Sequence, residues 1–127
     1  MENRSKVLPF LKFWLPVYLF AAVIFILSSV PELGKIPGPK HIDKVCHMAE
    51  YAVFGFLLAR AFKNSDRSYW RANFQFLAIG FAILYGLTDE IHQKFVDLRN
   101  SSVFDLFFDG LGAVIGSILC KSEKGSE

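Results

Sequence analysis

The sequence contains little cysteine and little charge, and these two shortages exclude several kinds of protein. Its two cysteines, Cys46 and Cys120, form no CxxC or zinc-binding pattern and are interpreted as apolar filling residues. Charged residues are only 20% of the chain, and they are not arranged along a groove-facing helix, so nothing supports nucleic-acid binding. No internal repeat and no low-complexity segment is present. The remainder is 53% hydrophobic with 14 phenylalanines, which is typical of a one-domain integral membrane protein surrounded by a lipid bilayer.

Four apolar segments have the length of membrane-spanning helices. They lie at about residues 7–30, 43–62, 72–93 and 102–120. The sequence therefore predicts an all-α fold, a four-helix transmembrane bundle with antiparallel up-down topology. This single domain occupies residues 1–120, and a polar tail follows at 121–127. The two cysteines would then lie at opposite membrane faces, beyond the reach of a disulfide.

The first segment shares some features with a signal peptide, because Arg4 and Lys6 precede an apolar run. Its charge-free stretch from Phe13 to Val30 is longer than the apolar region of a typical signal peptide. No small-residue cleavage pattern follows at Pro31. We therefore expect a helix that is retained in the mature protein.

The distribution of lysine and arginine predicts how the chain is oriented. Nine of the 14 lie on the side that carries both termini, and such residues are enriched on the cytoplasmic side. Trp14, Tyr69 and Trp70 fall at the same boundary, as expected of an aromatic belt. We therefore expect both termini in the cytoplasm and a multi-pass protein of the inner (cytoplasmic) membrane.

Ionisable side chains enter three of the predicted spans near one end. They are Asp43, His47 and Glu50, then Asp89 and His92, then Asp105 and Asp109. Within each span the spacing follows i, i+4 or i+3, so these side chains share one helix face. Because the spans alternate in direction, all three polar ends lie in the same leaflet, which is the outer one in this orientation. Ionisable groups beside hydrocarbon usually mark a functional site, so we expect these seven to be mutually close, with Arg99 folding over them.

Simpler explanations apply to some of the charged residues. An interfacial position at a helix end explains four of them, namely Lys44, Glu90, Lys94 and Asp97. Asp43 and Asp105 lie near helix N-termini, where capping alone explains an acid. The cluster could also serve only as polar contacts that hold helices together. His47, Glu50 and Asp109 lie too deep in their spans for capping.

Small residues predict which helices pack closely. Gly112 and Gly116 form a GxxxG pattern that continues the polar face of the fourth span. Ala52, Gly55 and Ala59 form a similar stripe on the second span. The polar face of the fourth span therefore points into the bundle.

The residue types in the cluster suggest two kinds of chemistry. So many carboxylates cannot all ionise in a low dielectric, so either some hold protons or a cation binds. As general acids and bases, the candidate catalytic residues are His47, Glu50, Asp89 and His92. A divalent cation is the second option, with His47, Glu50, Asp89, His92 and Asp109 as candidate ligands. No HExxH motif is present, which weakens the case for metal.

Three motifs in this order resemble the VanZ-like family. They are DKxxHxxEY from Asp43 to Tyr51, DExHQxF from Asp89 to Phe95, and DxxxDxxG from Asp105 to Gly112, with Arg99 before the last. The resemblance covers about residues 43–116. It implies a small bacterial membrane protein, and the name-giving member is associated with resistance to the glycopeptide antibiotic teicoplanin. The candidate binding residues are Asp43, Tyr51, Glu90, Gln93, Arg99, Asp105 and Asp109.

The leading functional hypothesis is an acidic His/Asp/Glu pocket in the outer leaflet that binds or acts on a cell-envelope or lipid-linked molecule. A lipid-tailed substrate would enter this pocket sideways from the bilayer. A phosphorylated head group would require a bridging metal, or help from Arg99 and Lys44. The alternatives are a non-catalytic lipid- or partner-binding membrane protein and, as an oligomer, a proton- or ion-coupled carrier. The sequence leaves open whether a reaction is catalysed, which substrate is used and which oligomeric state forms.

Overall fold

The computed structural model describes residues 2–30, 42–97 and 102–120, and these residues contain no β-strand. The predicted all-α fold is therefore confirmed. The six helices are α1 (Glu2–Phe13), α2 (Leu15–Ser29), α3 (Ile42–Lys63), α4 (Ser68–Ala72), α5 (Phe74–Gln93) and α6 (Val103–Leu119). Arg99, the connection at 31–41 and the tail at 121–127 lie outside the described residues.

Among the described residues, three helical segments are long and apolar enough to cross a membrane. They are Arg4–Ser29, Ile42–Lys63 and Phe74–Gln93. Large apolar side chains on their surfaces are exposed, such as Phe76 at 81% and Leu84 at 61%, as expected of residues that face lipid. The protein is therefore consistent with a multi-pass membrane protein. The 17-residue α6 is not among the three, so the four-span topology stays a prediction.

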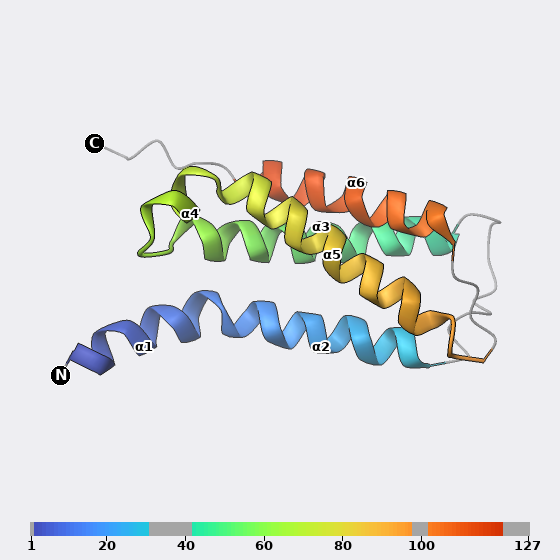
Figure 1. The fold of residues 1–127 in the computed structure, drawn as a ribbon, viewed down its shortest axis with the longest axis horizontal. Helices are drawn as coiled ribbons and strands as arrows, with labels where there is room; N and C mark the ends of the chain where they lie inside the picture. The colour runs from blue at the N-terminus through green and yellow to red at the C-terminus, as the bar shows by residue number, and fades with distance from the viewer. Residues whose placement is uncertain (1, 31–41, 98–101, 121–127) are drawn as a thin grey trace.

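Proline explains why the first apolar segment consists of two helices. Pro16 has no N–H to donate to the carbonyl of Lys12, so the helix is interrupted at Trp14 (Figure 1). The segment expected at 7–30 is therefore divided into α1 and α2, with a bend where they meet (Figure 1). A similar interruption at Asn73 separates the short α4 from α5, which begins two residues later than expected.

The closest helix pair is α3 with α6, and glycine makes this contact possible (Figure 1). A Cβ on Gly112 would overlap the carbonyl oxygen of Met48, and one on Gly116 would overlap that of Ala52. On the opposite side of the contact, a Cβ on Gly55 would lie 2.6 Å from the carbonyl oxygen of Ala113. The predicted small-residue packing between these two segments is therefore confirmed.

The α2 helix lies against α3 and α5 more loosely (Figure 1). One polar contact joins it to α5, because the hydroxyl of Tyr85 donates to the carbonyl oxygen of Ala21 at 2.5 Å. At the end of the molecule that carries α1 and α4, the Phe62 ring packs against Trp14 at 5.1 Å and Trp70 at 5.3 Å. The start of α3, the end of α5 and the start of α6 meet at the other end. Most of the predicted polar residues lie there.

Candidate functional site

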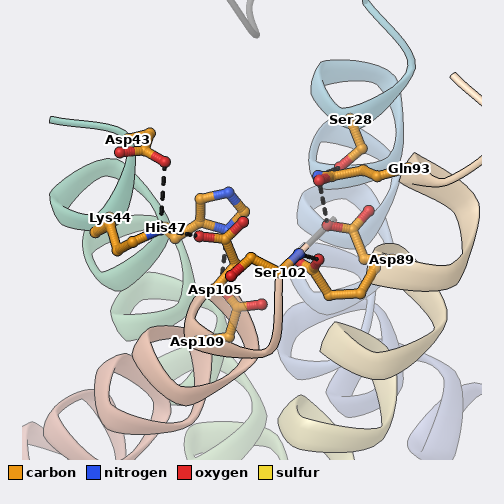
Figure 2. A network of polar contacts seen from close by, with 10 residues as sticks. Ser28, Asp43, Lys44, His47, Asp89, Gln93, Ser102, Asp105 and Asp109 are labelled. Atoms are coloured by element: carbon orange, nitrogen blue, oxygen red, sulfur yellow. Dashed lines mark hydrogen bonds and ion pairs between the residues drawn. The ribbon is translucent and has the colours of Figure 1, made fainter. Parts of the chain in front are cut away.

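A network of polar side chains occupies the end of the molecule where α3, α5 and α6 meet (Figure 2). It has one part between α3 and α6 and another between α5 and α2. The first part contains Lys44, His47, Asp105 and Asp109, and the second contains Ser28, Asp89 and Gln93. The predicted residues among these therefore lie at the same end of the molecule.

A histidine–carboxylate pair is the most buried polar contact of the first part. His47 Nδ1 lies 2.9 Å from Asp109 Oδ1, with 12% of the His47 side chain exposed and none of Asp109. Gly86 lets α5 approach this pair, since a Cβ there would lie only 3.1 Å from Asp109 Oδ2. A buried carboxylate that holds one ring nitrogen orients the imidazole, which leaves its other nitrogen to act as a base or as a metal ligand.

Tyr51 adds a second buried polar atom beside this pair. Its hydroxyl and Asp109 Oδ2 are both buried and make no hydrogen bond to any residue that the structure describes. Buried polar atoms normally have a partner, so these two are suited to a ligand, a proton or a cation. The Tyr51 hydroxyl also lies within electrostatic range of Asp109, Asp89 and the half-buried Glu50. Carboxylates from α3, α5 and α6 thus act electrostatically on one phenol.

Lys44 and Asp105 form a second ion pair between α3 and α6. Lys44 Nζ lies 2.7 Å from Asp105 Oδ1 and 3.5 Å from Asp43 Oδ2. The Asp105 side chain is 5% exposed, and Ser102 rather than Asp105 caps α6 by accepting from the N–H of Phe104. Lys44 therefore makes a specific contact with α6, and capping by its own side chain does not explain Asp105. Asp43, more than half exposed, lies at the edge of the network.

The Lys44→Met variant tests this pair, because it removes the ammonium group and leaves Asp105 nearly buried without its partner. We expect the free energy of unfolding to fall by about 1–3 kcal/mol. The exposed Lys94 is a matched control, and Lys94→Met should change that free energy by less than about 0.5 kcal/mol. Loss of helicity on titration with SDS measures both values. Equal effects of the two substitutions would contradict the role given to Lys44.

Glu90 is buried, although its place at a helix end suggested an interfacial residue. It is 5% exposed, and its Oε2 accepts a hydrogen bond from the backbone N–H of Ser102 at 3.0 Å. Donor atoms of His47, Glu90 and Asp109 lie within 4.8 Å of one another. One imidazole nitrogen with two carboxylate oxygens is a donor set that fits a divalent transition metal such as zinc. Only His47 and Asp109 of this set were among the expected metal ligands.

The contacts of His92 are with α2 rather than with the His47–Asp109 pair. Its Nε2 lies 2.9 Å from Ser29 Oγ, and its ring stacks on Phe25 with the ring centres 4.6 Å apart. The expectation that both histidines share one catalytic or metal cluster is therefore not met by the geometry. His92 is held by a neutral hydroxyl and an aromatic face.

The α2 helix also contributes Ser28, a residue that sequence reasoning did not select. The Gln93 amide donates to Ser28 Oγ at 3.3 Å and to Asp89 Oδ2 at 3.4 Å. Ser28 and Asp89 are each 5% exposed. The sequence feature that could have indicated Ser28 is the Ser28–Ser29 pair at the end of an otherwise apolar run. Hydroxyl groups there can satisfy polar atoms of a neighbouring helix.

A surface groove between α5 and α6 borders this network. Its polar part is a pocket of about 200 Å³ lined by Leu87, Glu90, Ile91, Lys94, Ser102, Val103 and Leu106. A neighbouring apolar pocket of about 430 Å³ forms the other part, lined by Ile83, Val103, Leu106, Phe107, Gly110, Leu111 and Val114. Val103 and Leu106 line both parts. Glu90 therefore connects the interior cluster with an amphiphilic groove on the surface.

The fold and the site define a class, a helical membrane-type protein with ionisable residues gathered at one end. The model of the VanZ/LLP1 family matches residues 5–123, nearly the whole chain, and the protein belongs to that family. No curated protein and no solved structure matches the chain. The resemblance to VanZ-like proteins that the motifs indicated is thus confirmed.

Proposed function

We propose that this protein binds a lipid-linked molecule of the bacterial cell envelope in the α5–α6 groove and acts on its polar part with His47, Asp109 and Glu90. The observation that carries this proposal is the position of Glu90. Its side chain lines the surface groove, and its carboxylate lies within 4.8 Å of donor atoms of the buried His47–Asp109 pair. A ligand in the groove would therefore reach the ionisable groups.

The groove has the chemical character of an amphiphile's binding site. Its larger part is lined by apolar side chains and suits a hydrocarbon tail. Its smaller part offers the Lys94 ammonium and Ser102 beside Glu90, which suits an anionic or hydroxylated head group. A tail of this kind enters sideways from the bilayer, so no opening through the end of the bundle is needed.

The chemistry proposed for the site is acid–base catalysis. Asp109 holds Nδ1 of His47, so Nε2 is the nitrogen that accepts a proton from a nucleophilic hydroxyl or water. Where His47, Glu90 and Asp109 hold a divalent cation, the cation supplies activation of bound water and stabilisation of a phosphate oxygen. Glu50 and Asp89 then act through their charges rather than by direct contact with the substrate.

The proposed topology places this chemistry in the outer leaflet. The 17 residues of α6 are at the lower limit for a membrane crossing, and its glycine contacts hold it along α3. With four spans and the observed excess of lysine and arginine beside the termini, both termini lie in the cytoplasm of a bacterium. The acidic end then faces the outside of the inner membrane, where envelope intermediates are exposed.

The name-giving member of the family is associated with resistance to teicoplanin, so teicoplanin resistance is the property to measure. We expect expression of the wild-type chain in a susceptible bacterium to raise the inhibitory concentration of teicoplanin. His47→Asn, Asp109→Asn and Glu90→Gln should each abolish the increase, because each removes a group that reaches the ligand. Asp97→Asn makes the same chemical change at an exposed residue of this end and should leave it intact. Full resistance in the three site variants, at equal abundance in membranes, would refute the assignment of the site.

Native mass spectrometry with metal analysis separates catalysis from binding alone. Purified His47→Asn protein should retain a lipid-linked molecule that the wild type turns over. Val103→Trp should lose it, because Val103 lines both parts of the groove. Phe104→Trp is the control, since Phe104 is 69% exposed and lines neither part. If His47→Asn keeps both the ligand and the resistance, the protein is a non-catalytic binder.

A further inference from the structure

A second pocket lies at the opposite end of the molecule from the His47–Asp109 pair, near the ends of α1, α3 and α6. It has a volume of about 550 Å³ and is lined by Lys12, Phe13, Phe56, Arg60, Lys63, Asn64, Leu119 and Cys120. Three of these residues are cationic, and none of the described residues that line the pocket is acidic. We propose that this pocket binds the phosphate of an anionic phospholipid. The inference is independent of the proposed function, because the two sites share no residue.

Two of the cations converge on one aromatic ring. Lys12 Nζ lies 5.3 Å and Arg60 Cζ 4.9 Å from the centre of the Phe13 ring. The ion pairs among the described residues are those of Lys44 and His47, so neither Lys12 nor Arg60 is paired with a described acidic residue. Both positive groups line the same pocket, and an anion bound there would be stabilised by both of them. Arginine with lysine is a combination that suits phosphate oxygens.

Helix capping does not account for the arrangement of Arg60. Arginine in the last turn of a helix often bonds the terminal carbonyl groups. Here the carbonyl oxygen of Arg60 already accepts from the Asn64 side chain at 2.8 Å, and that of Phe62 accepts from Ser65 N at 3.1 Å. The half-buried guanidinium is directed toward Phe13 and the pocket instead. It is therefore available to a ligand.

The walls of the pocket favour a lipid over a soluble phosphate. Phe56 on α3 is 37% exposed, and Leu119, the last residue of α6, is 63% exposed. Acyl chains would cover these side chains while the phosphate contacts Lys12 and Arg60. Basic pockets between helices at a membrane surface bind anionic lipid head groups in this way. In the predicted orientation the pocket faces the cytoplasmic leaflet.

The test measures lipid retention by the full chain. The protein is purified in neutral detergent, and bound phosphatidylglycerol and phosphatidylcholine are counted by native mass spectrometry. We expect wild-type protein to keep one phosphatidylglycerol, and occupancy to fall about tenfold or more in the Lys12→Gln/Arg60→Gln variant. Arg4→Gln/Lys6→Gln removes the same charge from two exposed residues of α1, the helix that carries Lys12, and this variant should bind as the wild type does.

One further variant and one competition experiment complete the test. Arg60→Lys keeps the charge but loses the planar fork, so it should show an intermediate loss even if the double glutamine variant does not fold. Inorganic phosphate in millimolar excess should not displace the lipid. Equal retention of the two lipids, unchanged occupancy in Lys12→Gln/Arg60→Gln, an equal loss in Arg4→Gln/Lys6→Gln, or displacement by inorganic phosphate would each overturn the proposal.

Discussion

Replacing Gly116 with leucine is expected to prevent α3 and α6 from packing, and thereby to remove most of the folded protein from the membrane. A Cβ at this position would overlap the carbonyl oxygen of Ala52 and lie 2.7 Å from the backbone nitrogen of Phe56. Both neighbours are helix backbone, which cannot move aside as a flexible side chain does. Overpacking of this kind costs about 1–3 kcal/mol or more, a large part of a typical folding free energy. Abundance in membranes and SDS-induced loss of helicity measure the effect.

Gly80 provides the matched control. It also lies in a long apolar helix, but no atom lies within 4 Å of a Cβ built there, and the residue is exposed. Gly80→Leu should therefore leave the free energy of unfolding within about 0.5 kcal/mol of wild type. If Gly116→Leu proved as stable as Gly80→Leu, the close contact between α3 and α6 would be contradicted.

The second large effect concerns the His47–Asp109 pair. His47→Leu removes the only described hydrogen-bond partner of a carboxylate that is not exposed at all. Breaking one side of a buried ionic pair costs about 3–5 kcal/mol, whereas replacing both sides with apolar residues is often neutral. We therefore expect His47→Leu to destabilise strongly, and His47→Leu/Asp109→Leu to recover most of the lost free energy of unfolding. SDS titrations of the two single variants and the double variant measure this coupling.

His92→Leu is the comparison for this cycle. It makes the same substitution at a histidine whose partner is the neutral hydroxyl of Ser29, so its cost should be nearer to about 1 kcal/mol. The double variant at His47 and Asp109 should be folded yet fail to confer resistance, which separates stability from function. Additive effects of the two leucine substitutions would show that the pair is not coupled.

Much of the helical architecture could be predicted because membrane-length apolar runs permit few other structures. Lipid offers no hydrogen bonds to the backbone, so a long apolar segment must be helical. The interruptions at Trp14 and Asn73 were not predicted. Pro16 was visible in the sequence, but prolines are tolerated near the start of a membrane helix, so its position alone did not indicate a break.

The polar residues lie at one end of the molecule, as expected, but their contacts with one another were not predicted. Helical spacing shows which residues share a face, yet it does not show which neighbouring helix that face meets. His92 lies against α2, while Glu90 lies near His47 and Asp109. The contact between Lys44 and Asp105 was not predicted. Whether a lysine side chain reaches a neighbouring helix depends on the distance between the two helices, and the sequence does not give that distance.

The amino-acid sequence by itself determined that the chain is helical, that its charged residues must gather away from hydrocarbon, and that glycine marks the closest helix contact. These properties follow from the local cost of exposing backbone and charge to lipid. Only the tertiary structure decided how each helix is rotated about its axis, and therefore that Glu90 rather than His92 joins the His47–Asp109 pair. That rotation depends on the summed packing of α2, α3, α5 and α6, which no single segment contains.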